Sequence, residues 1–92
     1  MRMRDRELLS KLAGLGCVVC GGPAQIHHSR AGMGIGMRAG DDAAYPLCAY
    51  HHLYGPVGDA VHKGRAKWEE RHGAESEHIK RCQARVGWTS TR

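Results

Sequence analysis

The chain has 92 residues, contains no Phe, and carries a formal net charge of +5 with its histidines neutral. This length allows one domain, expected over residues 1–92, whose apolar core is so small that a structural metal would help to hold it. The basic balance favours a polyanionic partner such as nucleic acid, although a basic domain without one is also consistent with it. The N-terminal segment has no long apolar run, so we expect no signal peptide, no membrane span and a cytosolic location.

The first predicted element is a helix over residues 5–15, where leucines recur at helical spacing before a glycine. Next comes CVVCGG, residues 17–22, whose glycines permit the positive φ of a turn that wraps backbone amides around a metal-bound sulfur. The stretch AQIHHSR, residues 24–30, is short and ends in polar residues, which predicts a strand.

The glycine-rich segment AGMGIGMRAGDD lacks the Gly-Lys-Ser/Thr ending of a phosphate-cradling loop. We interpret it as a flexible connection; the alternative is a loop whose backbone and Arg38 approach a phosphate. AAYPLC, residues 43–48, resumes as a second short strand, and the residues after it predict a short helix or turn. Residues 58–73 and 75–88 predict two helices, the first with Asp59 as a possible N-cap.

Two Cys/His pairs share the spacing of metal-binding knuckles. Cys17 and Cys20 are separated by two residues, as are Cys48 and His51, and 27 residues lie between the pairs. Zinc takes four such ligands in a tetrahedron, and each pair would supply two of them from one turn. The pattern predicts a structural Zn²⁺ site of the Cys3His type, against the alternative of buried cysteines without metal. Cys82 could replace His51, but it lies in a predicted helix without a partner at knuckle spacing, and we interpret it as a half-buried thiol.

The histidines of interest that remain after that assignment are His27, His28, His52 and His62. Neighbouring residues of a strand point to opposite faces, so His27 and His28 can flank one small site but cannot serve one atom in the same way. Two imidazoles suit a divalent ion, and an unbound imidazole suits a general base. That division fits phosphodiester hydrolysis, in which the metal neutralises charge on the phosphate and on the departing oxygen. For any one histidine alone, an ordinary surface or core role is the alternative.

In chain order, the CxxC pair, the first HH pair, the stretch PLCxxHH and the later histidine of AVHKG together resemble the HNH endonuclease family. The stretch from HHSRAGMG to WEERHG looks most like its phage RecA-dependent nuclease branch. The resemblance implies an α+β fold: a small ββα-metal domain with a zinc-knuckle-stabilised core and flanking helices. The core is expected over residues 16–75, an N-terminal helix over 1–15, and a C-terminal helix and tail over 76–92. The branch also implies a phage or prophage gene whose product acts in the cytoplasm of a bacterial host cell.

The resemblance further implies a role for each histidine. His27 and His62 bind the catalytic ion, His28 activates water as the general base, and His52 orients the base or its loop. The ion is Mg²⁺, Mn²⁺ or Zn²⁺, and the products carry 5′-phosphate and 3′-hydroxyl ends. Two further histidines match no position of the motif, and we interpret them as helix-surface residues: His72 and His78.

The first hypothesis is therefore a metal-dependent endonuclease whose substrate is DNA. The alternatives are a non-catalytic zinc module that binds nucleic acid or protein, and a structural or regulatory small phage protein; both leave the histidine pattern without a purpose. Dependence on a RecA filament stays open, because some relatives carry a long basic N-terminal region where this chain has a short one. The oligomeric state also stays open, because one active site nicks one strand. Basic residues expected either to contact phosphates or to form a solvated face are Arg30, Arg38, Lys63, Arg65 and Lys67.

Overall fold

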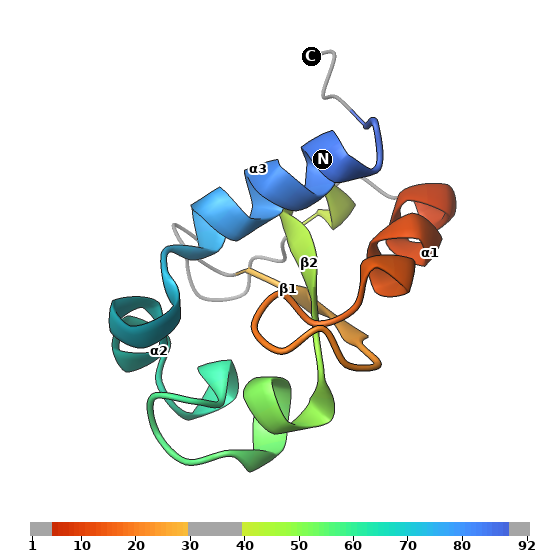
Figure 1. Ribbon diagram of the computed structural model, residues 1–92. Helices are drawn as coiled ribbons and strands as arrows, with labels where there is room; N and C mark the ends of the chain where they lie inside the picture. The colour runs from red at the N-terminus through yellow and green to blue at the C-terminus, as the bar shows by residue number, and fades with distance from the viewer. Residues whose placement is uncertain (1–4, 30–39, 89–92) are drawn as a thin grey trace.

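The computed structural model describes residues 5–29 and 40–88. Helices surround a two-stranded antiparallel hairpin, with α1 and α3 both in contact with its second strand (Figure 1). This arrangement confirms the α+β class. Within the described residues the elements in chain order are α1 (Arg6–Leu15), β1 (Gln25–His28), the 3-10 turn η1 (Asp41–Ala43), β2 (Ala44–Leu47), the π-helical turn η2 (Tyr50–Tyr54), the 3-10 turn η3 (Val61–Lys63), α2 (Arg65–His72) and α3 (Glu75–Arg85).

The hairpin forms the centre of the molecule and sets the orientation of the first His pair. β1 runs antiparallel to β2 with His27 opposite Tyr45 and His28 opposite Ala44. All four residues of β2 are buried, whereas in β1 only His27 is buried. Because successive side chains of a strand point to opposite faces, His27 faces the interior and His28 faces the other side.

Helix α1 forms where the leucine pattern predicts it. The Asp5 carboxylate accepts a hydrogen bond from Leu8 N at 3.0 Å and so caps the first turn. Leu8 and Leu12 are the buried residues of this helix and pack into the core. The helix ends at Gly16, whose φ of 85° favours glycine and where a Cβ would lie 2.7 Å from Gly21 O.

The core is assembled around aromatic side chains from β2 and α2. Trp68 and Tyr45 have no exposed surface, and their ring centroids lie 6.0 Å apart. Trp88 packs partly buried against the same core, and its Nε1 donates to Asp5 Oδ2 at 3.2 Å. The small core therefore depends on a few large side chains.

Several expectations about the second half of the chain are wrong. The helix predicted over residues 58–73 is interrupted at Gly64, whose φ is 149°, so that His62 lies on η3 rather than on an α-helix. Asp59 precedes this break and caps neither segment. His78 is buried, with 6% of its surface exposed, instead of lying on the helix surface.

The glycine-rich segment lies almost wholly outside the described residues, as do Arg30 and Arg38. In the part of the chain that is described, no helix is long and apolar enough to cross a membrane.

Candidate metal centres and active site

The two predicted knuckles come together in the fold. Sγ of Cys20 lies 3.7 Å from Sγ of Cys48, and Nδ1 of His51 lies 3.2 Å from Sγ of Cys48 and 3.8 Å from Sγ of Cys17. Each knuckle also directs a backbone amide at a sulfur: Val19 N at Cys17 and His51 N at Cys48, at 3.4 and 3.5 Å. The four side chains Cys17, Cys20, Cys48 and His51 could therefore hold a metal ion.

The amides of the knuckles also change the acidity of the ligands. Burial would raise the pKa of the Cys17 thiol, but hydrogen bonds from backbone groups of Cys48, Cys20 and Val19 lower it below its ordinary value. A lower thiol pKa favours the thiolate, which is the form that binds metals. Cys82 lies on α3, is buried, and is not part of this cluster.

A second cluster forms from histidines that are far apart in the sequence. His27, His52 and His62 each place one ring nitrogen within 4.8 Å of the others. The Nε2 atoms of His52 and His62 lie 3.0 Å apart, and the ring centroids of both lie 5.0 Å from that of His27. The cluster runs from buried His27 through half-buried His52 to exposed His62, so it opens to solvent on one side.

The surroundings keep two of these imidazoles neutral. Burial, together with the nearby His27 and His62, lowers the pKa of His52 to about 4. Burial and His27 also lower the pKa of His62, an effect that Glu75 partly offsets. Neutral imidazoles carry the lone pair that a metal ion needs. Nδ1 of His52 lies 2.7 Å from Oε1 of Gln25, so Nδ1–H donates a hydrogen bond to this amide oxygen and Nε2 carries the free lone pair.

His27 contacts a buried carboxylate at the start of α3. Its Nε2 lies 3.1 Å from Oε2 of Glu75, which also accepts a hydrogen bond from Tyr45 Oη at 2.6 Å. Ser29 Oγ donates to the other oxygen of Glu75 at 2.9 Å. Burial would raise the pKa of Glu75, but these hydrogen bonds from His27, Tyr45 and Ser29 lower it.

His28 lies outside the three-histidine cluster and has its own acidic partner. Its Nε2 lies 2.9 Å from Oδ1 of Asp41, in η1, and its side chain is 37% exposed. The other oxygen of Asp41 accepts a hydrogen bond from Asp5 N at 2.7 Å, which ties this carboxylate to the start of α1. A histidine with one ring nitrogen on a carboxylate and the ring open to solvent has the arrangement of a general base.

A third group, centred on Asp59 and His72, lies close to His51. Oδ1 of Asp59 lies 3.0 Å from Nη1 of Arg71 and 3.2 Å from Nε2 of His72. The hydrogen bond from Arg71 and the one from His72 lower the pKa of Asp59 despite an opposing effect of desolvation. Tyr50 Oη donates to the other oxygen of this carboxylate at 3.4 Å, so Asp59 has three partners. We therefore interpret the group as an ion-pair network that joins the loop before η3 to α2.

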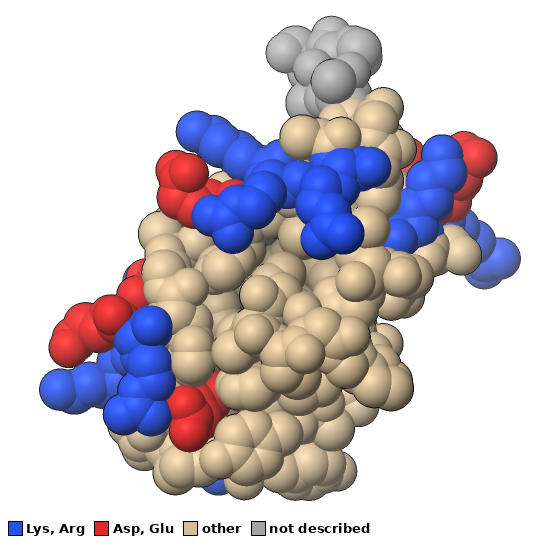
Figure 2. Space-filling model, viewed as in Figure 1, with Lys and Arg blue, Asp and Glu red and all other residues tan. Residues whose placement is uncertain are grey.

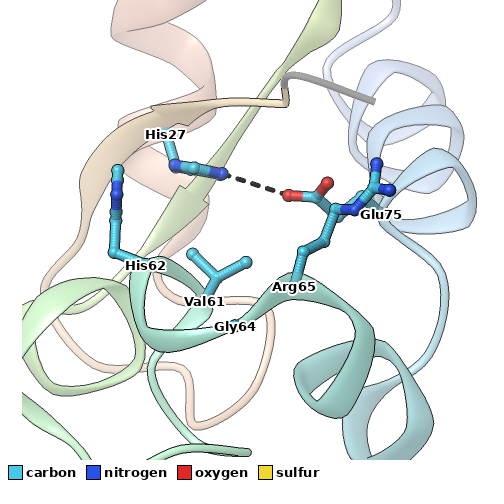
Figure 3. A pocket seen from close by; sticks show the side chains of 6 residues that line it. All are labelled: His27, Val61, His62, Gly64, Arg65 and Glu75. Atoms are coloured by element: carbon cyan, nitrogen blue, oxygen red, sulfur yellow. Dashed lines mark hydrogen bonds and ion pairs between the residues drawn. The ribbon is translucent and has the colours of Figure 1, made fainter. Parts of the chain in front are cut away.

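A cavity of about 200 Å³ opens beside the three-histidine cluster. Figure 3 shows His27 and His62 at one side of it and Arg65 and Glu75 at the other. Among the predicted basic residues that the structure describes, Arg65 is the one that lines this cavity beside the cluster. Its guanidinium lies 4.0 Å from Glu69 and its side chain remains 48% exposed.

Other basic residues have different surroundings. Lys63 donates to the carbonyl oxygen of Gly55 at 3.0 Å, which gives it a role in the loop, and Lys67 lines a separate cavity. Figure 2 shows Lys and Arg side chains gathered along α3. None of the basic residues predicted from the sequence to contact phosphates lies on this helix. Its exposed basic residues are Lys80, Arg81 and Arg85.

Sequence reasoning also missed the residues that orient the histidines: Gln25, Asp41 and Glu75. Each is a common polar residue at a position without a spacing signal, and only the packing of separate elements brings it to its histidine. Asp41 lies in a predicted connection and Glu75 at the start of a predicted helix, and neither position indicates a contact with a histidine.

Over residues 2–86 the chain matches the model of a family described as "Protein of unknown function (DUF968)". Because this match spans most of the chain, the chain belongs to that family. No curated protein gives a significant match. The family description names no reaction or ligand.

Proposed function

We propose that the chain is a metal-dependent DNA endonuclease of the HNH type, with a structural zinc ion beside a catalytic ion. The observation that carries this proposal is the division of adjacent histidines: His51 joins the cysteine cluster, while His52 joins His27 and His62. A hairpin followed by a histidine-bearing turn and a helix also agrees with a ββα-metal unit.

The cysteine cluster has dimensions that suit zinc. Tetrahedral zinc with Zn–S bonds of about 2.3 Å places two sulfurs about 3.8 Å apart, and a sulfur and a nitrogen about 3.6 Å apart. The distance between Cys20 and Cys48 is 3.7 Å, and those from His51 to two sulfurs are 3.2 and 3.8 Å. Three thiols and one imidazole are a common ligand set of structural zinc sites.

The three-histidine cluster suits a divalent ion with open positions. An octahedral ion with bonds of about 2.1 Å places neighbouring ligand atoms about 3.0 Å apart, which is the separation of the Nε2 atoms of His52 and His62. An ion held by three imidazoles would neutralise charge on the scissile phosphate and on the departing oxygen. Imidazole ligands favour Zn²⁺, whereas Mg²⁺ is favoured by its supply in the cell.

His28 is the general base in this proposal. When Asp41 accepts the proton on Nε2, Nδ1 of His28 carries a lone pair and takes a proton from the attacking water. The water oxygen then bonds to phosphorus as the bond to the 3′ oxygen breaks, and the departing 3′ oxygen takes a proton from solvent water, which leaves 5′-phosphate and 3′-hydroxyl ends. Arg65 is placed to contact a phosphate beside the cluster, and the basic surface of α3 offers further contacts to a polyanion.

The test is nicking of supercoiled plasmid by purified protein with added Mg²⁺, Mn²⁺ or Zn²⁺. We expect wild type to nick, and we expect His28→Ala to slow cleavage by about 10²- to 10⁴-fold, the usual contribution of a general base. Gln83→Ala is the matched control, because Gln83 Nε2 donates to the carbonyl oxygen of Asp42, within η1, and not to His28 or its partner carboxylate.

Metal content separates loss of the base from loss of the fold. Both variants should retain one tightly bound zinc ion, and His62→Ala should lose cleavage together with the second ion. If wild type cuts neither plasmid nor single-stranded DNA with any of the metals, the assay is repeated on DNA carrying a RecA filament. Failure there as well would leave a non-catalytic zinc module and refute the nuclease.

A further inference from the structure

Glu75 is a charged side chain that the proposed chemistry does not itself use. It has only 1% of its surface exposed, although it is the first residue of α3. Burying a carboxylate is costly unless hydrogen bonds replace its water. Tyr45, Ser29 and His27 supply those hydrogen bonds from both strands of the hairpin and from the residue after β1.

The hydrogen bonds of the Glu75 carboxylate determine whether Nε2 of His27 is a donor or an acceptor. The hydroxyls of Tyr45 and Ser29 donate to Oε2 and Oε1 of Glu75, at 2.6 and 2.9 Å. An ionised carboxylate has no proton to give, so Nε2 of His27, 3.1 Å from Oε2, must be a donor as well. The proton of neutral His27 is therefore on Nε2, and its lone pair is on Nδ1.

The position of the cluster relative to this hydrogen bond completes the argument. Figure 3 shows Glu75 and His62 on opposite sides of the His27 ring. The ring nitrogen that Glu75 leaves free is thus the one available to the cluster. The same arrangement occurs at His52, where Nδ1–H donates a hydrogen bond to Oε1 of Gln25 and Nε2 faces His62.

We propose that Glu75 is a positioning residue, which holds the proton of His27 on Nε2 and so directs the Nδ1 lone pair toward an ion shared with His52 and His62. This proposal rests on the ion site of the proposed function. Carboxylate partners of metal-binding histidines fix the tautomer and the ring orientation, and their loss commonly costs about 10- to 100-fold in metal affinity.

The competing explanation is that Glu75 only joins α3 to the hairpin. Its backbone N–H also donates a hydrogen bond to Oε2 of Glu69 at 2.8 Å, which holds the start of α3 to α2. A purely structural carboxylate would affect stability without changing where His27 carries its proton. The two explanations therefore differ in a spectroscopic quantity and not only in activity.

The experiment uses the full chain with zinc bound at the cysteine cluster, as wild type, Glu75→Gln and the control Ser29→Ala. Long-range ¹H–¹⁵N correlation spectra of the imidazoles at neutral pH show which ring nitrogen of His27 bears the proton. Calorimetric titration with Zn²⁺ then gives the affinity for a second ion. Ser29→Ala removes one donor to Glu75 and leaves the atom that contacts His27, so it reports the structural effect alone.

We expect the proton on Nε2 of His27 in wild type and Ser29→Ala, and an altered tautomer balance with about 10- to 100-fold weaker binding of the second Zn²⁺ in Glu75→Gln. A proton on Nδ1 of His27 in wild type overturns the proposal. This result comes from the wild-type spectrum alone, so it does not depend on whether Glu75→Gln folds. Unchanged Zn²⁺ affinity in Glu75→Gln overturns the role of Glu75 alone. A wild type that binds no second Zn²⁺ overturns instead the ion site of the proposed function.

Discussion

His51 and His52 are adjacent in the chain, yet their imidazoles belong to two different clusters. Nδ1 of His51 lies 3.2 Å from Sγ of Cys48, whereas Nε2 of His52 lies 3.0 Å from Nε2 of His62. The π-helical turn η2 carries both, and π-helical turns often occur at functional sites. Whatever fixes the ring of His51 thus also restricts where His52 can lie.

This relationship predicts that Cys48→Ser damages both clusters. Structural zinc supplies about 10–16 kcal/mol of binding free energy in small zinc domains, more than a core of this size provides, so the variant should lose zinc and cooperative unfolding. Zinc stoichiometry and thermal unfolding by circular dichroism measure this. Cys82→Ala is the matched control, since Cys82 lies outside the cluster, and it should keep its zinc. A folded Cys48→Ser protein with one zinc ion would refute the assignment.

Asp41→Asn should slow DNA cleavage by at least about tenfold, because an amide can present its NH₂ group to His28 and reverse the tautomer needed by a base. The amide oxygen can still accept from Asp5 N, so the contact between η1 and α1 survives. Single-turnover cleavage rates measure the effect, with metal content as the control. Rates equal to wild type would argue against His28 as the base.

Arg65→Ala should weaken DNA binding and reduce the slope of log affinity against log salt by about one. Arg65 lines the cavity next to His27 and His62, so its guanidinium is expected at a phosphate. Lys11→Ala serves as the comparison, because Lys11 lies on α1 and pairs with Glu7 at 3.9 Å. Fluorescence anisotropy at several salt concentrations gives both slopes. Equal slopes for wild type and Arg65→Ala would remove this residue from the DNA contact.

Cys82 should react slowly with thiol reagents in the folded protein, and faster as the pH rises. Burial raises the pKa of its thiol above the ordinary 9.0, partly offset by Arg85 and Arg81, so little thiolate is present near pH 8. The buried neutral thiol of Cys82 makes its full contribution to the free energy of unfolding below pH 9.0. That contribution is lost as the pH rises through the higher pKa that the thiol has in the folded state. Alkylation kinetics with zinc bound, followed by mass spectrometry, test the reactivity. Rapid labelling of Cys82 at neutral pH would contradict its burial.

Trp68→Ala should destabilise the fold by about 3–5 kcal/mol, the usual cost of truncating a large buried aromatic residue. Trp68 has no exposed surface and packs against Tyr45, which in turn contacts Glu75. Tyr54→Ala is the control: Tyr54 is 75% exposed and should change stability by less than about 0.5 kcal/mol. Urea unfolding of the zinc-loaded proteins measures both. Similar values for the two variants would mean that the core lies elsewhere.

The sequence predicts best the features that depend on local spacing. The helix at the leucines of α1 and the meeting of the two Cys/His pairs were predicted correctly, because helical period and Cys/His spacing act within a few residues. Gly64 was missed as a helix break because a single glycine inside a helical pattern is often tolerated. The partners of the histidines, such as Glu75 for His27, lie 48 residues away and follow only from how α3 packs on the hairpin.

The short distance along the chain from Cys48 to His62 has a consequence for how related sequences can vary. Adding or deleting a residue between Cys48 and His52 would rotate one histidine out of its cluster, so the length of that turn should be constant among family members. The loop from Gly55 to Ala60 is under a weaker constraint, because it holds no residue of either cluster and is tied to its neighbours through Gly55 O and the Asp59 carboxylate. Insertions in the family are therefore expected in that loop, with a compensating change at Asp59 or Arg71 where their ion pair is lost.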